Sequence, residues 1–525
     1  MDVTLAAESF GTAYTFIRRE LTRNRISEEI IMETMLLFEA LYNDLLEQGF
    51  DRETLLTLTM HNTFGEINIK LGFEGKPYIP VPKNPTDVSP EISILLAYDD
   101  KVDYRYSTGY NNIRIIVKRN HSINQMRCFA GILLAILVYI PLSIFVSFEE
   151  RQAIEERIVF PLVKLYANAM LMVGAPVTLF SLVKNLTDTY IVSERSSSGR
   201  RLQMKAVITS FISVLLALLT SIFIAKLFDS RDGYLAKNLS LGGTMSFSEV
   251  IASLVPSSIF EPFETFMPFP LIIVALLITY AFCSAGKHFE IIKQAVDVCY
   301  NLFSKMLHVV MFALPFFCFL AILTPMLAVG IGDLLLIAEL AFLIIVSIIV
   351  LFIFYLIRLL IGGVELGTFL KHLPPLILEN IRINSAIDAV PFNVRYCVKK
   401  YGYNRKRLSE ELTILAQTNL DGNCYLLMLL SMIFVFLMGL DISWFQILVI
   451  AILVLFLSLG APNQPGSILI GTLIIVLYLH ADDLISMAIY CEVLFGAVQN
   501  LINVLGDIVT VAIEDQKAKK VSRNL

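Results

Sequence analysis

The chain has 525 residues, of which 56% are hydrophobic and only 17% are charged, and its formal net charge is −5. It is more apolar than a soluble domain needs to be, which excludes a protein that lies wholly in water. No basic surface for nucleic acid is expected. The seven cysteines form no CxxC pair or Cys/His cluster, so neither a structural metal site nor a disulfide framework is expected.

The first 123 residues have the composition of a soluble domain, and no signal peptide is expected at their start. A helix should begin after Ser27, a favourable N-cap residue, and end before Gly49. Apolar alternation and β-branched residues predict four strands: Leu55–His61, Ile67–Phe73, Ile92–Tyr98 and Ile113–Val117. Residues 1–123 are therefore predicted to form an α+β domain.

One pair of polar residues on the predicted helix suggests a nucleotide site. Glu39 and Asn43 lie one helical turn apart, and Glu74 and Gly75 follow a predicted strand. This order resembles the Bergerat-fold ATPases, which include histidine kinases and anti-sigma-factor kinases. The resemblance implies that Glu39 and Asn43 hold water and magnesium beside ATP. The chain has Glu74 where that family has its adenine-binding aspartate, and it shows no clear glycine-rich lid. The alternative is an ordinary solvated helix face.

Residues 124–515 contain eight apolar runs, each long enough to cross a bilayer core of about 30 Å. In chain order these runs are Cys128–Phe148, Ile158–Val183, Ala206–Phe228, Pro268–Ser284, Leu307–Val329, Leu334–Leu360, Leu408–Leu440 and Leu484–Glu514. Basic clusters precede the first run and follow the second, fourth, sixth and eighth. The positive-inside rule therefore predicts that both termini, including the tail 516–525, are cytoplasmic.

Two further segments, residues 384–391 and 458–467, do not fit simple spans. The second interrupts an apolar run with two prolines, two glycines and two amides. Backbone that is not helical survives at membrane depth only where it is buried in protein or lines a cavity. Both segments are therefore predicted to be tips of re-entrant helical hairpins. The alternative, a solvent loop, is weaker for the second segment because no charged residue occurs between Ile442 and His480.

Two carboxylates lie inside the last two apolar runs. Asp421 is followed by Gly422 in the seventh run, and Asp507 ends a polar stripe in the eighth. A carboxylate at membrane depth costs about 2.5–3.5 kcal/mol on insertion scales, so a cation or a buried partner must offset it. Carboxylate and carbonyl oxygens suit a small hard cation. The alternative is a kinked helix with a protonated aspartate. The stripe of the eighth run consists of Glu492, Gly496, Gln499, Asn500, Asn503 and Asp507.

These features together resemble the dicarboxylate/amino acid:cation symporters, the family of the glutamate and aspartate transporters. The matching stretches are Pro161–Asp188, Val255–Phe260, Asn419–Gly422, Gly460–Gly466 and Asn503–Asp507. The resemblance implies an all-α membrane domain of eight transmembrane helices and two re-entrant hairpins. It also implies a homotrimer in the inner membrane, in which a mobile transport domain slides like an elevator along a scaffold. The partners are then the lipid bilayer, a small organic solute and Na⁺ or H⁺. No cofactor is expected, and Na⁺ serves as the coupling ion.

The resemblance also assigns cation ligands. The family's sodium ligands fall on the side chains of Asn419, Asp421, Asn503 and Asp507 and on the backbone carbonyls of Ser458, Leu459 and Ala461. A hydroxyl cluster of the third span falls near Ser210 and Ser213.

The solute positions depart from the family pattern. The aspartate that holds a substrate amino group is Gly496 here, and the arginine that pairs with a side-chain carboxylate is Gln499. Bidentate arginine recognition of glutamate, aspartate or a C4-dicarboxylate is therefore not implied. A neutral or singly charged solute fits better. The predicted solute residues are Ser385, Gln464, Gly496, Gln499, Asn500 and Asn503.

Three hypotheses for the function follow. The first is a non-enzymatic symporter that couples Na⁺ influx to uptake of an amino acid or a carboxylate-like solute. The second is a transporter-derived sensor that signals through its N-terminal domain. The third is a structural membrane protein with degenerate sites. The retained cation residues favour the first over the third, and the lost aspartate and arginine keep the second open.

Overall fold

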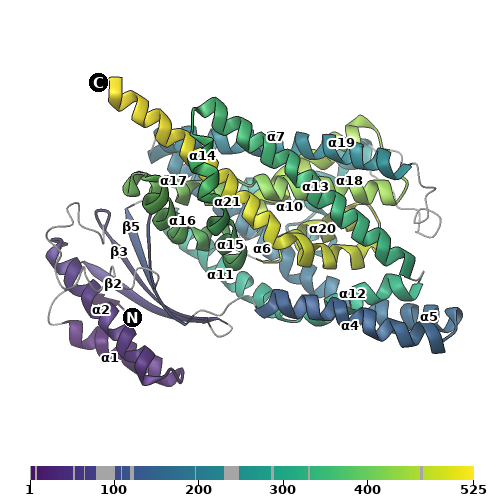
Figure 1. Cartoon of the computed structure of the whole chain (residues 1–525), viewed down its shortest axis with the longest axis horizontal. Helices are drawn as coiled ribbons and strands as arrows, with labels where there is room; N and C mark the ends of the chain where they lie inside the picture. The colour runs from purple at the N-terminus through teal and green to yellow at the C-terminus, as the bar shows by residue number, and fades with distance from the viewer. Residues whose placement is uncertain are drawn as a thin grey trace. The chain divides into compact units, whose positions relative to one another are not determined.

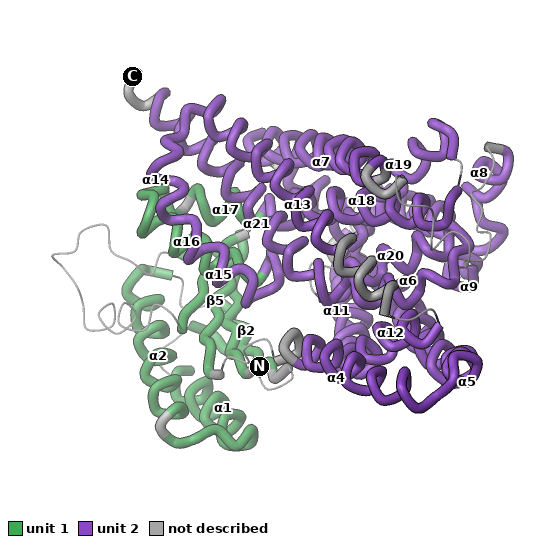
Figure 2. Tube along the Cα trace, turned by 45° about the vertical axis from the view of Figure 1, so that its right-hand side comes forward, with its two compact units in different colours: residues 1–121, 388–413 green, residues 122–387, 414–525 purple. Residues whose placement is uncertain are grey.

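Figure 1 shows the computed structural model of the chain. It describes residues 2–5, 9–50, 54–63, 66–78, 101–107, 109–118, 123–195, 197–229, 247–265, 267–284, 289–328, 331–440, 442–461 and 465–524. The chain divides into two compact units, coloured in Figure 2. Unit 1 comprises residues 1–121 and 388–413, and unit 2 comprises residues 122–387 and 414–525.

Unit 1 is built on an antiparallel sheet with the strand order β1-β2-β3-β5-β4. Its strands are β1 (Asp2–Thr4), β2 (Leu55–Thr63), β3 (Glu66–Glu74), β4 (Val102–Ser107) and β5 (Tyr110–Lys118). Three of the predicted strands are confirmed as β2, β3 and β5, whereas residues 92–98 lie outside the described residues. The short β1 and β4 were not predicted, although Val102, Tyr104 and Tyr106 of β4 alternate with polar residues.

Two helices, α1 (Phe10–Arg23) and α2 (Glu28–Glu47), contribute to the hydrophobic core of unit 1 with one face of this sheet. Ser27 is the N-cap residue of α2, although its side chain makes no capping hydrogen bond. Val102 and Tyr104 of β4 lie in the core with residues of both helices. Successive residues of a strand point to opposite faces, so Asp103 lies on the other face.

Unit 1 also includes residues 388–413, which are far away in sequence. They contain most of α16 (Ala386–Tyr401) and the beginning of α17 (Arg405–Thr418). These helices are drawn in the colour of unit 1 in Figure 2 over residues 388–413.

Unit 2 is helical. Its first helices are α4 (Ile123–Phe145), α5 (Phe148–Ile154), a π-helical turn (Glu155–Val159), α6 (Phe160–Arg195), α7 (Ser197–Asp229), α8 (Phe247–Ser253), α9 (Glu261–Thr265), α10 (Pro268–Cys283), α11 (Phe289–Phe312) and α12 (Leu314–Ala328). They are followed by α13 (Ile331–Gly362), α14 (Leu366–Lys371), α15 (Leu373–Ile383), α18 (Asp421–Leu437), α19 (Trp444–Gly460), α20 (Ser467–Tyr478) and α21 (Ile485–Asn524). Within the described residues, 7 helical stretches are long and apolar enough to cross a membrane, and four shorter apolar helices accompany them. The protein is therefore a multi-pass membrane protein.

Several predicted spans have other bounds in the structure, and two of them bear on the number of crossings. The run Leu307–Val329 covers the end of α11 and all of α12, which are separated at Ala313. Pro315 in the first turn of α12 has no N–H and disfavours a helix that continues from α11. The run Pro268–Ser284 corresponds to α10, a helix of only 16 residues. The number of eight crossings thus stays a prediction.

Both predicted interruptions coincide with helix breaks. Helix α15 ends at Asn384, which has a left-handed φ of 50°, and α16 begins at Ala386. Helices α19 and α20 are separated by residues 461–466, where Gly466 has a φ of 102°. Whether these breaks are re-entrant hairpin tips in a bilayer stays a prediction.

Helix α18 is almost completely enclosed by other helices of unit 2. It lies among the helices of unit 2 (Figure 1) and contacts α7, α19, α20 and α21. Nearly all its side chains are buried. By contrast, α4, α7 and α13 expose large apolar side chains such as Leu133, Leu219 and Ile353, as expected for helices that face lipid. The polar residues that surround the start of α18 are thus buried deep inside the unit.

Candidate functional site

The candidate site begins at the break between α17 and α18. Asn419 and Leu420 lie between the two helices, and α18 starts at Asp421. The next residue must be glycine, because a Cβ atom on Gly422 would lie 2.2 Å from the backbone oxygen of Gln499. The start of α18 therefore lies against the backbone of α21.

The two predicted membrane carboxylates meet at this break. Asp421 is 0% exposed and Asp507 is 3% exposed. The Asn419 Nδ2 donates to Asp507 Oδ1 over 2.9 Å. A Cβ atom on Gly506 would lie 2.6 Å from Asn419 Nδ2 and 2.7 Å from Asp421 Oδ2. Asn419, Asp421 and Asp507 thus form one buried cluster, which we call the acid cluster.

Hydroxyl groups from two other helices complete the acid cluster. Ser210 Oγ of α7 donates to Asp421 Oδ1 (3.2 Å), and Tyr355 Oη of α13 donates to Asp421 Oδ2 (2.9 Å). Thr209 Oγ1 donates to Asn419 Oδ1 (3.2 Å). The Ser213 hydroxyl instead donates a hydrogen bond to the backbone oxygen of Thr209. The expected hydroxyl cluster of the third span therefore reaches the acid cluster through Thr209 and Ser210.

Asn503 connects the acid cluster to a second polar group. Its Oδ1 accepts from the backbone N–H of Gly422 over 2.8 Å, and its Nδ2 donates to Asn423 Oδ1 over 2.8 Å. Asn423 Oδ1 also accepts from Gln499 Nε2. Ser467 Oγ at the start of α20 donates to Gln499 Oε1 over 2.9 Å. Asn423, Ser467, Gln499 and Asn503 form what we call the amide cluster.

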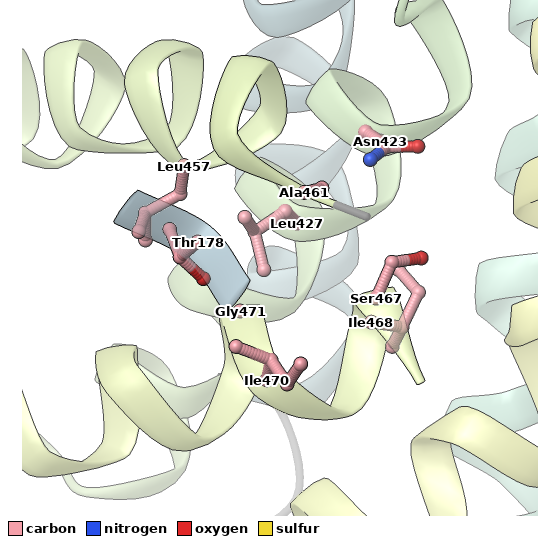
Figure 3. A pocket seen from close by; sticks show the side chains of 9 residues that line it. All are labelled: Thr178, Asn423, Leu427, Leu457, Ala461, Ser467, Ile468, Ile470 and Gly471. Atoms are coloured by element: carbon pink, nitrogen blue, oxygen red, sulfur yellow. The ribbon is translucent and has the colours of Figure 1, made fainter. Parts of the chain in front are cut away.

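A small cavity adjoins the amide cluster (Figure 3). Asn423 and Ser467 contribute polar side chains to it, together with Thr178 of α6. Its remaining lining residues are apolar or glycine: Leu427, Leu457, Ala461, Ile468, Ile470 and Gly471. The cavity lies where α6, α18, α19 and α20 meet.

The other predicted solute residues have different surroundings. Asn500 Nδ2 donates to Asn384 Oδ1 (2.8 Å) and so joins α21 to the break before α16. Ser385, the next residue, is buried. Gln464 lies outside the described residues.

The predicted carbonyl ligands face α6: Asn185 Nδ2 donates to the oxygen of Leu459 over 2.7 Å, and Ser181 Oγ donates to that of Ala461 over 3.3 Å. Ser458 is buried in the same turn of α19.

Gly496 has a role that the sequence did not reveal. A Cβ atom there would lie 2.6 Å from Oε1 of Glu492, one turn earlier on α21. The Glu492 carboxylate accepts from the backbone N–H groups of Gly466 (2.8 Å) and Leu469 (3.1 Å) at the start of α20. Gly496 therefore makes room for Glu492, which holds the start of α20. The polar stripe already contained Glu492, but its partners lie more than twenty residues away and are backbone groups.

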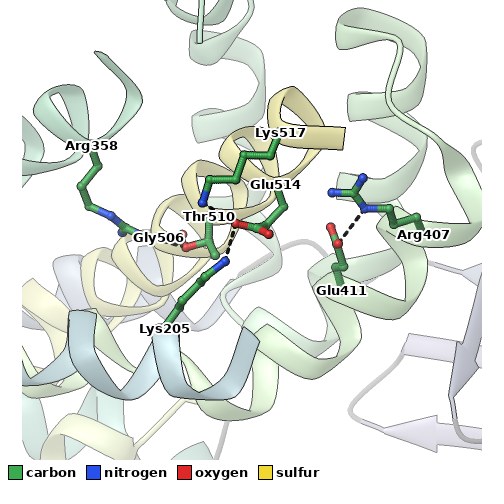
Figure 4. A network of polar contacts seen from close by, with 8 residues as sticks. All are labelled: Lys205, Arg358, Arg407, Glu411, Gly506, Thr510, Glu514 and Lys517. Atoms are coloured by element: carbon green, nitrogen blue, oxygen red, sulfur yellow. Dashed lines mark hydrogen bonds and ion pairs between the residues drawn. The ribbon is translucent and has the colours of Figure 1, made fainter. Parts of the chain in front are cut away.

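A second residue missed by the sequence analysis is Arg358 on α13. Its NH2 donates to Thr510 Oγ1 over 3.0 Å, and that hydroxyl donates to the backbone oxygen of Gly506 (Figure 4). The signal of Arg358 in the sequence was a lone arginine near the end of the sixth apolar run. Asp421 and Asp507 themselves form no ion pair in the part of the chain that the structure describes.

The two residues of the predicted nucleotide site lie on α2. Glu39 is exposed and Asn43 is partly buried. The neighbouring Asp44 points inward instead and accepts from the Tyr78 hydroxyl in the core of unit 1. ATP binding through Glu39 and Asn43 stays a prediction.

Two acids buried beside a helix break, in a bundle of apolar helices, are typical of a membrane carrier. The model of the sodium:dicarboxylate symporter family matches residues 126–517 of the chain. The protein therefore belongs to this family, as the sequence motifs predicted. A search of curated proteins found no match. The family match leaves out residues 1–125, which contain the sheet of unit 1.

Proposed function

We propose that the protein is a secondary active symporter that couples Na⁺ influx to uptake of a small amino acid or carboxylate-like solute. The acid cluster is the observation that carries this proposal. The proposal includes the elevator mechanism, a homotrimer in the inner membrane and cytoplasmic termini, all of which rest on the family.

The acid cluster suits a small hard cation. Asp421, Asp507 and Asn419 offer carboxylate and amide oxygens within one buried site, with the hydroxyl of Ser210 beside them. Two buried carboxylates without an ion pair carry a large desolvation cost, which a bound cation offsets. We assign Na⁺ to this cluster, with Asn503 between the cation and the solute. The carbonyls of Ser458, Leu459 and Ala461 are proposed as ligands of a second Na⁺.

The amide cluster favours a solute without a second carboxylate. Gln499 and Asn423 offer neutral amide groups, and Ser467 offers a hydroxyl. Such groups discriminate by hydrogen bonds and provide no positive charge. We therefore propose a neutral polar or singly charged solute, held near Gln499, Asn500 and Asn503.

The variant Asp507→Asn tests the cation assignment. It removes one of the two negative charges while keeping the size of the side chain. In proteoliposomes with a sodium gradient, we expect the uptake of a solute that the wild-type protein transports to fall by at least about tenfold, because a buried charge interaction is lost. The matched control is Asp482→Asn, since Asp482 is a partly exposed acid paired with Lys164 on the surface of unit 2. Normal sodium dependence in Asp507→Asn would refute the assignment.

A second candidate function is a solute sensor. One observation favours it: residues 388–413 of the family-matched region form a compact unit with the N-terminal domain. A sensor would bind solute in a sodium-dependent way without any flux, and it would change the hydrogen exchange of the N-terminal domain. Sodium-driven flux in proteoliposomes would exclude a pure sensor.

A further inference from the structure

The side of the unit 1 sheet opposite its core carries opposite charges on neighbouring strands. Asp103 of β4 and Arg114 of β5 are register partners, so their side chains point to the same face. The core residues Val102, Tyr104, Ile113 and Ile115 alternate with them and point to the other face. A polar sheet face that is free in water leaves such side chains exposed.

Here the Asp103 side chain is only 9% exposed, because α16 covers it. Arg395 NH1 lies 3.3 Å from Asp103 Oδ1 and donates to the backbone oxygen of Val102 over 2.9 Å. The Arg395 side chain is itself only 13% exposed. Two turns earlier on α16, Asp388 Oδ1 lies 3.6 Å from Arg114 NH1. The positive Arg395 of the helix thus faces the negative Asp103 of the sheet, and the negative Asp388 of the helix faces the positive Arg114 of the sheet.

The beginning of α17 contributes a further positive charge, that of Arg405, to the same compact unit. Burial raises the pKa of the Tyr104 phenol, and the positive charge of nearby Arg405 opposes this rise. The same arginine acts on Tyr78, whose hydroxyl donates to Asp44. The ion pairs of α16 therefore hold residues 388–413 to the sheet, and the beginning of α17 belongs to the same compact unit.

In the sequence, residues 388–413 lie between two parts of the candidate site. This segment begins three residues after Ser385 and ends six residues before Asn419. The domain is also tied covalently to the first apolar helix, since β5 ends at Lys118 and α4 begins at Ile123. Five Cα–Cα steps reach at most about 18 Å. The domain therefore connects the start of α4 with a segment that leads directly into the acid cluster.

We propose that the N-terminal domain is a brake on the carrier, and that it acts by binding residues 388–413 of its own chain through the Asp103–Arg395 and Arg114–Asp388 pairs. The brake rests on the proposed function, because it slows a transport cycle. The binding contact itself does not depend on that function. While the contact holds, the domain restrains the segment 388–413, which joins the break at Asn384 to the break at Asn419. Rupture of the contact releases both breaks for the movement that transport requires.

A charge-reversal series in the full-length protein tests the contact and the brake separately. Asp103→Arg places two positive charges together, and the double variant Asp103→Arg/Arg395→Asp restores an opposite pair. We expect hydrogen exchange of residues 388–413 to be at least about fivefold faster in Asp103→Arg and to return to the wild-type rate in the double variant. Arg18→Glu is the control, because Arg18 and its partner Glu28 are both largely exposed. Arg395→Gln replaces Asp103→Arg if the latter does not fold.

Uptake in proteoliposomes then tests the brake. We expect sodium-driven uptake about fivefold faster in Asp103→Arg than in the wild type, and a wild-type rate in the double variant. Unchanged exchange in both Asp103→Arg and Arg395→Gln would overturn the contact. Faster exchange with unchanged or slower uptake would overturn the brake. If neither the wild type nor any variant shows flux, the proposed function and the brake both fail, and the exchange data still decide the contact.

Discussion

Gly422 shows how one residue without a side chain determines the geometry of the candidate site. A Cβ atom at this position would meet the backbone oxygen of Gln499 at 2.2 Å, and backbone cannot rotate away as a side chain can. Gly422→Ala should therefore push α18 away from α21 and lengthen the hydrogen bond from Gly422 N–H to Asn503. Overpacking of this kind costs about 1–3 kcal/mol. We expect a lower unfolding temperature and weaker sodium-dependent stabilisation in a thermal unfolding assay.

The matched control for this variant is Gly367→Ala on α14. No heavy atom lies within 4 Å of a Cβ atom built there, so the unfolding temperature should not fall. Equal behaviour of the two variants would contradict the close contact between α18 and α21.

Residue-level prediction from the sequence was better for the acids than for their neighbours. A lone carboxylate in an apolar run is visible in one dimension, and Asp421 and Asp507 do lie together. The partners of Glu492 are backbone N–H groups of another helix, and every residue type has these. The position of Arg358 beside Thr510 likewise depends on the packing of α13 against α21. Contacts of these two kinds leave no pattern in the sequence.

At the level of elements, Glu492 fixes the start of α20 to α21. The two oxygens of its carboxylate accept from two different N–H groups. In Glu492→Gln, one oxygen is replaced by an NH₂ group that cannot accept, so one buried N–H loses its partner. This costs about 1–3 kcal/mol. We expect a lower unfolding temperature and faster hydrogen exchange at residues 466–470.

Glu261→Gln is the control for this variant. Glu261 accepts from the backbone N–H of Ser257 in a similar way. Ser257 is exposed, so water can replace the lost acceptor. If both variants lose the same stability, or if neither does, then the carboxylate of Glu492 does not hold α20.

The elements differ in how far the sequence predicted them. The interruption between α19 and α20 was visible because prolines and glycines disrupt an otherwise apolar run. The separation of α11 from α12 was missed because the apolar run continues through it, although Pro315 marks the break. Strand β4 was missed although Val102, Tyr104 and Tyr106 alternate with Asp103, Arg105 and Ser107, the pattern of a half-buried strand. In the structure these polar positions lie on the sheet face opposite the core.

At the level of the whole molecule, composition was sufficient to predict a membrane protein, and motifs were sufficient to predict the family. The inclusion of residues 388–413 in unit 1 was not foreseeable. It depends on Arg395 and Asp388 meeting a sheet almost three hundred residues earlier in the chain. Charge complementarity of single pairs over such separations occurs by chance in any sequence with charged residues, so it becomes informative only with coordinates.

The proposed coupling between sodium and solute would be a property of the whole molecule. If Asn503 connects the acid cluster and the amide cluster, each ligand should raise the affinity for the other by the same factor. A ligand at one hundred times its Kd stabilises the folded protein by about 2.7 kcal/mol.

In a thermal unfolding screen, we expect neutral polar amino acids to stabilise the protein with sodium and not with choline. Glutamate and aspartate should have little effect, because the amide of Gln499 provides no positive charge for a second carboxylate. Strong sodium-dependent stabilisation by aspartate would contradict this assignment of Gln499, and equal stabilisation in sodium and in choline would contradict the connection through Asn503.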